Sequence, residues 1–258
     1  MLHAKRVVHR RLNDGFRLVP VLHSRPFAAD TGLVSFEGTS SSIWSTHPIE
    51  RPYLIYQIGT ANPELAVQAA LRVANDVSGV DLNCGCPKPF STSGGMGAAL
   101  LDKPDLIYEI LTGLRKALPS HLSVSCKIRL LPTSEATLNL VRKIVQTGIS
   151  CLTVHCRTRN MRKGEKAIPG RMKEIVDLVK SMNVDVAVLA NGDCLSVDDA
   201  KRLREITGAD GAMIATAAES NPSCFRSEAN GGLADADTRI IPDFLRLVRV
   251  LPHRPAHN

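Results

Sequence analysis

Apolar and polar residues follow a repeating order along the chain from residue 53 onward. Short, nearly continuous apolar runs alternate with longer segments in which apolar residues recur every three or four positions. The first pattern is typical of buried parallel strands, and the second is typical of amphipathic helices packed on them. It predicts strands at 53–58, 80–83, 123–128, 151–155, 184–190 and 212–215, and helices at 63–76, 104–117, 134–147, 170–182, 196–206 and near Pro222.

This alternation predicts an α/β domain with a parallel sheet. Polar residues also end several of the strands, and polar groups at the carboxyl ends of successive strands are typical of the active-site face of a TIM barrel. A doubly wound sheet would instead carry a G-x-G-x-x-G turn after its first strand, and the sequence has none there. We therefore expect a TIM (β/α)8-like barrel. It is expected to be incomplete, because six βα units are recognisable and not eight.

The first 51 residues follow no such order. Pro20, Pro26 and a Gly/Ser/Thr-rich stretch at 38–45 interrupt them, and only 33–36 resembles a strand, which we expect to pair in a hairpin. The Arg-rich, acid-poor start is compatible with a mitochondrial presequence. We favour instead a helix at 5–12 with a solvated basic face.

Composition narrows the class of protein. The 258 residues are 44% hydrophobic, which suits one large α/β domain, and no apolar run reaches the roughly 18 residues needed to span a membrane. The seven cysteines are scattered and odd in number, which suits a reducing compartment. The cytoplasm is the expected location, with the nucleus as an alternative. Cys84-x-Cys86 lacks the spacing usual for zinc, so no metal is expected.

The formal net charge is +7, and basic residues cluster between 157 and 173. A basic cluster beside the rim of an active site suits a polyanion such as RNA, whereas a solvated basic face is the simpler alternative. The candidate RNA-binding residues are Arg157, Arg159, Arg162 and Lys163.

The segment 80–101 carries the main chemical candidate. A short strand passes into a turn that holds Cys86, and a loop containing Gly94, Gly95 and Gly97 follows. The strand fixes one end of the loop, and the glycines permit positive φ angles and movement. On spacing alone, an ordinary βα loop with two buried thiols fits equally well.

Two blocks in this segment resemble the tRNA-dihydrouridine synthases: NCGCPK at 83–88 and STSGGMGAALL at 91–101. The likeness is greatest to the eukaryotic branch that acts on uridine 20 of tRNA, and it extends with gaps from about Lys5 to about Val250. Compared with that family, the chain looks truncated at both ends and lacks the first two strands of the barrel. The resemblance divides the chain into an irregular segment 1–51, an FMN-binding barrel-like catalytic domain 52–226, and the start of a truncated helical segment 227–258.

The resemblance implies an enzyme that reduces the C5=C6 bond of a tRNA uridine to 5,6-dihydrouridine. FMN is the implied cofactor, recharged by NADPH or NADH. After hydride addition to C6, C5 needs a proton, and an ordinary thiol is still mostly protonated at neutral pH. Cys86 occupies the position of the family's proton donor. Cys84 replaces an apolar residue of the family, which indicates a packing role.

The resemblance also assigns cofactor contacts. Gln57 matches a glutamine that binds the edge of the flavin ring, and Lys127 matches a lysine near the reactive end, where a cation stabilises the reduced anion. His155 matches a histidine that contacts the cofactor. The two expected phosphate loops contain Asn191, Gly192, Asp193, Ala215 and Thr216.

Three positions depart from the family. Asp193 and Cys156 replace glycines, and Thr216 replaces an arginine, which removes a charge-assisted contact of about 1.5–3 kcal/mol, or roughly 10- to 100-fold in affinity. An RNA-binding remnant with a broken flavin site is therefore the alternative, and the colour of the purified protein distinguishes the two. A barrel that acts on a small molecule such as dihydroorotate is disfavoured by the basic cluster and the glycine-rich loop.

Overall fold

The computed structural model describes residues 6–11, 24–26, 33–37, 42–162 and 164–250 of the chain. Within these residues, parallel strands form a curved sheet in the order β1-β5-β6-β7-β8-β9-β10. In this part of the chain the two edge strands, β1 and β10, do not pair with each other, so the barrel is open between them. The strands are β1 Arg6–Arg11, β5 Leu54–Gly59, β6 Gly79–Asn83, β7 Ser123–Leu130, β8 Cys151–Thr158, β9 Ala187–Asn191 and β10 Gly211–Met213.

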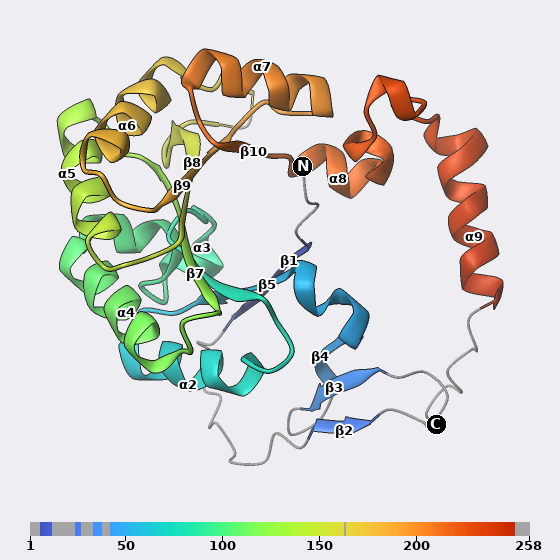
Figure 1. Cartoon of the computed structure of the whole chain (residues 1–258), viewed down its shortest axis with the longest axis horizontal. Coiled ribbons are helices and arrows are strands. Elements are labelled where there is room, and N and C mark those ends of the chain that lie inside the picture. The colour runs from blue at the N-terminus through green and yellow to red at the C-terminus, as the bar shows by residue number, and fades with distance from the viewer. Residues whose placement is uncertain (1–5, 12–23, 27–32, 38–41, 163, 251–258) are drawn as a thin grey trace.

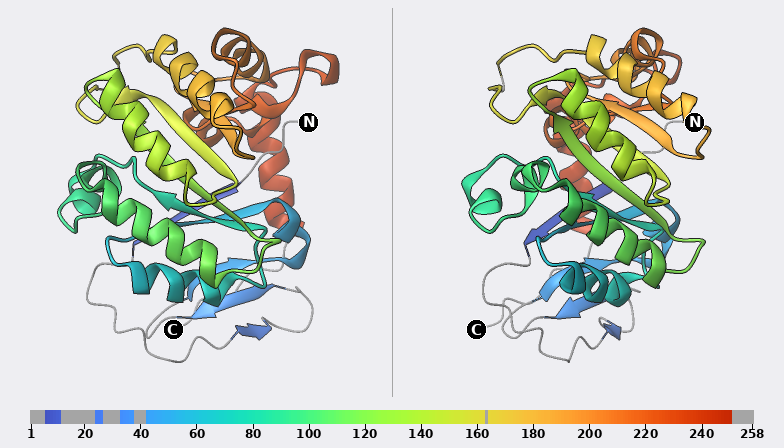
Figure 2. Two further views of the ribbon diagram at one scale, coloured as in Figure 1. Left: turned by 60° about the vertical axis from the view of Figure 1, so that its left-hand side comes forward. Right: turned by 90° about the vertical axis from the view of Figure 1, so that its left-hand side faces the viewer.

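Amphipathic helices cover the outer, convex side of this sheet (Figure 1). Figure 2 shows them stacked side by side over the strands. The start of the first follows from its sequence: Asn62 accepts a hydrogen bond from the Leu65 N–H at 3.0 Å, and Pro63 occupies the first turn. The helices are α2 Pro63–Val73, α4 Pro104–Ala117, α5 Ser134–Val145, α6 Gly170–Ser181 and α7 Val197–Thr207.

The six predicted strands are all present as β5 to β10, and the incomplete TIM-barrel architecture is confirmed. β10 is shorter than expected, because Ala215 has φ −122° and ψ −75°, outside the extended region. The region near Pro222 forms two short elements, α8 Thr216–Ser220 and the 3-10 helix η3 Pro222–Phe225.

The predicted helix at 5–12 is wrong. Residues Arg6–Arg11 form strand β1, which pairs in parallel with β5 from Arg6↔Leu54 to Arg11↔Gly59. The adjacent Val7 and Val8 are β-branched and favour extended backbone. Pairing also satisfies the backbone groups of β5 that would otherwise form a free edge. β1 therefore covers the edge that β5 would otherwise present.

The hydrophobic core lies between the sheet and the helices. In β7, Val124, Cys126 and Ile128 point to the helices and are fully buried. The alternate positions of the same strand, Ser125, Lys127 and Arg129, face the opposite side because side chains alternate along a strand. The inner face of the sheet is therefore polar at its carboxyl end.

A small antiparallel sheet lies beside β5. It consists of β2 Ser24–Pro26, β3 Val34–Glu37 and β4 Ser42–Thr46, so the expected hairpin at 33–36 is confirmed. Trp44 stacks on Phe36 with ring centroids 4.7 Å apart and contacts Tyr56 of β5 at 5.1 Å. These aromatic contacts join the small sheet to the barrel and give Trp44 a packing role.

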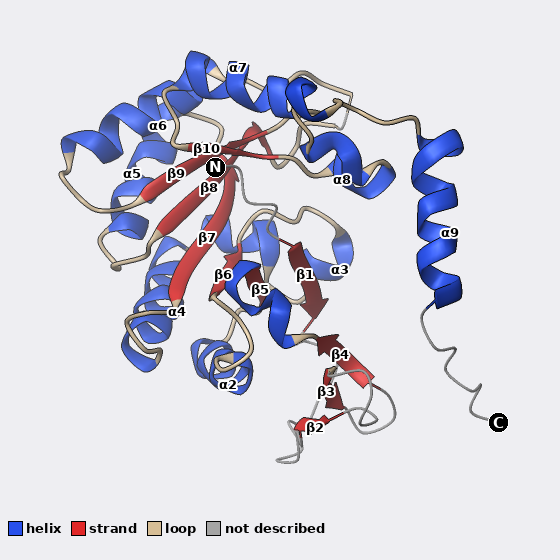
Figure 3. Cartoon of the chain, turned by 45° about the vertical axis from the view of Figure 1, so that its right-hand side comes forward, coloured by secondary structure: helices blue, strands red, loops and turns tan. Residues whose placement is uncertain are grey.

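The remaining elements are short, apart from the last. They are η1 Pro48–Tyr53, α3 Pro89–Thr92, η2 Gly97–Asp102, η4 Glu228–Asn230, the π-helical turn η5 Ala236–Ile240 and α9 Ile241–Val250. Figure 3 shows α9 standing apart from the helices that cover the sheet. In the part of the chain that the structure describes, every helix is too short or too polar to cross a membrane.

Candidate active site

The strand register gathers the candidate residues at one end of the sheet. Asn83 is the register partner of Lys127, and Arg129, His155 and Asn191 are partners on successive strands. Partners on neighbouring parallel strands point to the same face. Gln57 lies one layer deeper, opposite Asp81. The structure thus brings four predicted residues, Gln57, Lys127, His155 and Asn191, to the carboxyl ends of the strands.

Cys86 lies in the turn that follows β6. The side-chain oxygen of Asn83 accepts hydrogen bonds from the N–H groups of Gly85, at 3.0 Å, and Cys86, at 3.1 Å. From β7, the Arg129 Nε donates to the Gly85 carbonyl at 2.6 Å. The turn is therefore held on both sides, and the Cys86 side chain remains partly exposed at the rim.

The glycine-rich loop packs directly on this turn. The Ala98 N–H donates to the Cys86 carbonyl at 2.9 Å. Gly97 has φ +62°, and a Cβ there would lie 2.6 Å from that carbonyl and 2.2 Å from the Ser91 Oγ. Only glycine fits such a position. Cys84, by contrast, is fully buried with its Sγ 3.6 Å from that of Cys126, as expected for a packing thiol.

The centre of the rim is electrostatically crowded. Burial, followed by the charge of Arg129, lowers the pKa of Lys127 to about 8, although nearby Asp81 opposes the shift. Burial and then the charges of Lys127, Arg129 and Arg157 lower the pKa of His155 to about 3. His155 is therefore neutral at physiological pH, while Lys127 is mainly protonated and readily deprotonated.

Arg157 orients the His155 ring. Its guanidinium lies 3.3 Å from the His155 Nε2. Because a guanidinium can only donate, Nε2 accepts and the ring proton resides on Nδ1. A neutral imidazole with Nδ1–H can offer a hydrogen bond to a ligand at the rim.

Asp193 does not stand as a free negative charge. Its carboxylate forms an ion pair with Arg157 and accepts a hydrogen bond from the Ala167 N–H at 2.8 Å. Burial raises the pKa of Asp193, but these two hydrogen bonds outweigh burial, so its pKa lies below the usual value. Asp193 has φ +50°, a conformation that favours glycine and that aspartate tolerates better than most residues.

The loop after β9 is shaped by its backbone. The Asn191 side chain donates to the Met213 carbonyl on β10 at 2.9 Å. Gly192 has φ +130°, and a Cβ there would lie 3.0 Å from the Ala167 Cβ and 3.4 Å from the His155 ring. Glycine at 192 therefore lets the loop approach the end of β8.

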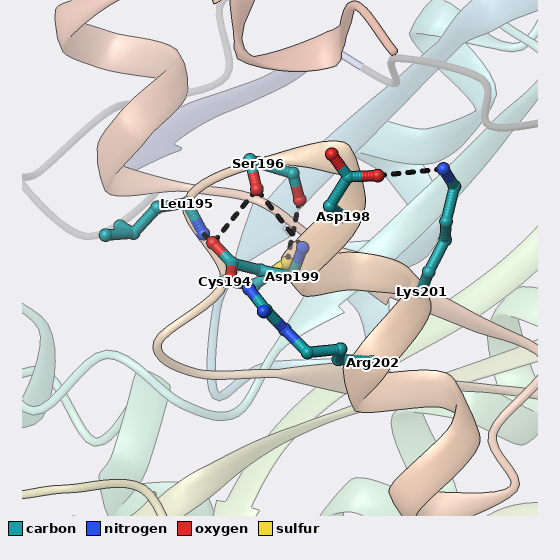
Figure 4. A network of polar contacts seen from close by, with 7 residues as sticks. All are labelled: Cys194, Leu195, Ser196, Asp198, Asp199, Lys201 and Arg202. Carbon is teal, nitrogen blue, oxygen red and sulfur yellow. Dashed lines mark hydrogen bonds and ion pairs between the residues drawn. The ribbon is translucent and has the colours of Figure 1, made fainter. Parts of the chain in front are cut away.

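The same loop runs into a capped helix. Figure 4 shows Ser196 and Asp199 at the start of α7. The Asp199 N–H donates to the Ser196 Oγ at 3.1 Å, and the Asp199 carboxylate accepts from the Leu195 N–H at 3.1 Å. This reciprocal capping box, with Arg202 paired to Asp199, fixes the exit of the loop. In the second expected phosphate loop, Ala215 and Thr216 are exposed at the start of α8.

Of the predicted RNA-binding residues that the structure describes, Arg157 does not share the exposed surface of Arg159 and Arg162. Arg157 is 7% exposed, and its guanidinium also donates to the Glu165 carbonyl at 2.6 Å. It is held inside the protein, so its expected place on an exposed basic rim is corrected. Arg159, paired with Asp102, and Arg162 are exposed. Lys163 lies outside the described residues.

The sequence indicated Asn83 and Arg129 only as polar residues at strand ends, and it indicated no role for Asp81 or Ser125. All four face the site because they alternate with buried residues of β6 and β7. Arg129 follows Lys127 by two positions, and Asn83 follows Asp81 by two. The period-two pattern of these strands was the signal that could have placed them on the same face.

Comparison with known proteins places the chain in a family. Residues 4–249 match the family described as dihydrouridine synthase (Dus). The chain is similar to the tRNA-dihydrouridine(20) synthase [NAD(P)+] of Schizosaccharomyces pombe, with 52% identity over 188 residues, which are 72% of this chain and 39% of the relative. For the Saccharomyces cerevisiae protein of the same name, identity is 43% over 192 residues, covering 71% and 49%.

A third relative extends the match to nearly the whole chain. The tRNA-dihydrouridine(16/17) synthase [NAD(P)(+)] of S. cerevisiae is 30% identical over 251 residues, covering 95% of this chain and 56% of the relative. The chain thus spans about half the length of these curated relatives, or less. The two motif blocks around Cys86, the parallel barrel strands and the match over residues 4–249 agree: the chain belongs to the dihydrouridine synthase family.

Proposed function

We propose that this chain carries the catalytic barrel of an FMN- and NAD(P)H-dependent tRNA-dihydrouridine synthase that reduces the C5=C6 bond of a tRNA uridine, uridine 20. The observation that carries this proposal is the position of Cys86. Its side chain is partly exposed at the carboxyl end of the sheet, and its turn is held by Asn83 and Arg129. The relatives with the highest identity carry the uridine-20 name.

The residues of the rim fit a flavin ring. Lys127 supplies a cation, His155 is neutral with an Nδ1–H to donate, and Gln57 is buried with its amide oriented by neighbours. On the side of the phosphate loops, Asp193 is already neutralised by Arg157 and does not repel an anion as a free carboxylate would. Gly192 allows close approach of the backbone. FMN, when bound and reduced by NAD(P)H, supplies the hydride for C6 of the uracil.

The protein must then supply a proton to C5. The Cys86 thiol is the acid: it donates S–H as electron density develops at C5, and the resulting thiolate is reprotonated from solvent. The Arg129 guanidinium, held against the neighbouring Gly85 carbonyl, places positive charge where the thiolate forms. A remnant that only binds RNA would not need this arrangement, and no observation favours that alternative.

The test combines cofactor and product. The chain is purified, its flavin content is measured by absorbance, and it is incubated with NADPH and tRNA from cells that lack dihydrouridine. Mass spectrometry of nuclease digests should find dihydrouridine at position 20. A flavin-loaded protein that leaves the tRNA unchanged at every position would overturn the proposal, and product at another position would overturn the assignment of uridine 20.

A further inference from the structure

A continuous chain of hydrogen bonds runs across three strands to the Cys86 turn. The Ser125 Oγ donates to one oxygen of Asp81 at 2.7 Å, and the Gln57 Nε2 donates to the other at 2.6 Å. The Asn83 Nδ2 donates to the Gln57 Oε1 at 3.0 Å. The Asn83 Oδ1 then accepts from the N–H groups of Gly85 and Cys86. The chain thus connects the interior of the sheet with the backbone of the catalytic turn.

The strand register explains why these groups meet. Gln57, Asp81 and Ser125 are register partners across β5, β6 and β7. Their residues are 2%, 7% and 7% exposed, so water cannot replace the bonds. Asn83 lies two residues beyond Asp81 on the same face and reaches Gln57 from above.

The donors and acceptors of this hydrogen-bond chain all point in one direction, and the Asp81 carboxylate determines that direction. Ionised Asp81 has acceptors only, so Gln57 must turn its NH2 group toward it. The Gln57 oxygen then faces Asn83, which must turn its own NH2 group toward Gln57. This leaves the Asn83 oxygen facing the turn, where two backbone N–H groups need an acceptor. If either amide were reversed, two donors or two acceptors would face each other in a buried site.

We propose that Asp81 is a positioning residue that sets the orientation of both amides and, through Asn83, holds the Cys86 thiol where it is presented at the rim. The effect on catalysis rests on the proposed function, whereas the effect on the turn does not. Gln57 is left with one N–H and one lone pair for a ligand, so the same carboxylate decides which part of Gln57 is available there.

Isosteric substitutions test the direction of the chain. Asn83→Asp places a second carboxylate opposite the Gln57 oxygen, so two acceptors face each other. Turning the Gln57 amide would remove this clash, but it would bring the Gln57 oxygen against the Asp81 carboxylate. Adding Asp81→Asn reverses the entire chain consistently: the new amide donates to Gln57 Oε1, and Gln57 Nε2 donates to the new carboxylate. That carboxylate still accepts from Gly85 and Cys86. Asp81→Asn alone is tolerated, because its amide can accept from Gln57 and donate to Ser125.

The readout is the rate at which iodoacetamide modifies Cys86 in the protein, followed by peptide mass spectrometry, with added glutathione as the external reference thiol. N83D should alkylate about fivefold faster or more, as expected when a hydrogen bond worth about 1 kcal/mol is lost. D81N and the double variant D81N/N83D should stay within about twofold of wild type. D81L/N83D balances the charge equally and lets Gln57 turn its NH2 group toward the new carboxylate, but it leaves the Gln57 Oε1 and the Ser125 hydroxyl without their partner at position 81, so it should stay faster than D81N/N83D.

Three results would overturn the proposal: N83D at the wild-type rate, D81N/N83D as fast as N83D, or D81L/N83D as slow as D81N/N83D. If N83D does not fold, recovery of a cooperative unfolding transition in D81N/N83D takes the place of the alkylation rate, and failure of both variants overturns the proposal. Dihydrouridine formation by the same variants separates the two claims. A wild-type protein that makes no product while the alkylation pattern holds refutes the proposed function and leaves the positioning role intact.

Discussion

The two halves of the rim are held together in different ways. On β5, β6 and β7, the side chains form a directed chain of hydrogen bonds from Ser125 to the Cys86 turn. On β8 and β9, the organising contact is an ion pair between Arg157 and Asp193, beside a neutral His155. The first half fixes geometry through the match of donors and acceptors. The second half cancels charge.

The difference shows where each half tolerates change. A directed chain of buried hydrogen bonds fails when one polarity is reversed, even at constant volume. An ion pair whose acidic partner is half exposed is screened by water and depends less on detailed geometry. The departures from the family at Asp193 and Thr216 both fall in or next to the second half, whereas the motif blocks around Cys86 fall in the first. Four experiments test this contrast.

The largest effect is expected at Cys86, where the first half meets the chemistry. Cys86→Ala should lower dihydrouridine formation by about 10²- to 10⁴-fold, the usual contribution of a general acid. Reduction of bound flavin by NADPH should stay at the wild-type rate, because the proposed mechanism uses the thiol only for proton transfer to C5. Stopped-flow absorbance measures the first half-reaction and mass spectrometry the product. Equal loss of both half-reactions would assign Cys86 a structural role.

Lys127 lies between the halves, and its buried charge should cost stability. Below pH 8 the folded protein holds an unfavourable ammonium. Between pH 8 and 10.5 the folded state releases this proton while the unfolded state keeps it, so stability rises with pH in that window. Lys127→Met removes the cost and should be more stable than wild type at pH 7, by about 3 kcal/mol at most.

Urea unfolding of wild type and Lys127→Met at pH 7, 9 and 10.5 measures this effect. The stability difference should shrink as the pH approaches 10.5. A difference that does not vary with pH would show that Lys127 carries no buried charge at neutral pH. Phe90→Met, at an exposed position on α3, serves as the matched control for adding a methionine side chain.

In the second half, Asp193→Gly should destabilise the fold by about 1–2 kcal/mol. Glycine suits the positive φ better, but the buried Arg157 guanidinium would lose its partner. The exposure of Asp193 limits the loss, because water screens the pair. In an Arg157→Gln background the same change should no longer destabilise. Chemical denaturation of the four proteins of this cycle provides the measurement. A more stable single variant would mean that Asp193 contributes strain and no useful pairing.

The smallest effect concerns the exposed cations beyond β8. Arg159→Glu with Arg162→Glu should weaken tRNA binding about tenfold, or 1.4 kcal/mol. The slope of log affinity against log salt should become shallower by about one to two units. Lys116→Glu with Arg142→Glu is the matched control, since these exposed residues lie near the carboxyl ends of α4 and α5, which lead to the opposite end of the sheet. Equal losses in both variants would indicate only a general charge effect.

Local patterns predicted most of the barrel. α4 has the predicted bounds 104–117, and α2 begins at Pro63 as predicted. β1 was mistaken for a helix because its strand character depends on pairing with β5, 48 positions away at Arg6↔Leu54, and on no local period. Short segments rich in both valine and arginine do not reveal such pairing on their own.

The sequence indicated individual residues of the candidate site but not the hydrogen-bond network that joins them. The family resemblance named Gln57, Cys86, Lys127 and His155. It does not show that Asn83 joins Gln57 to the Cys86 turn by hydrogen bonds. Arg157 was assigned to an exposed rim because it belongs to the basic cluster between residues 157 and 173. Arginine is seldom buried without a partner. The partner here is the Asp193 carboxylate, which lies 36 positions away in the sequence and replaces a glycine of the family.

Trp44 gives the molecule a natural optical reporter. It is the only tryptophan of the chain, and it lies between Phe36 and Tyr56, whose neighbour in β5 is Gln57. Being 8% exposed, its indole should emit at short wavelength while the small sheet is docked, and the emission should shift to the red when the sheet separates from the barrel. A flavin absorbs in the same spectral region, so its arrival at the rim should be visible as quenching of this one residue. Docking of the small sheet and binding of the proposed flavin can therefore be followed in unlabelled protein.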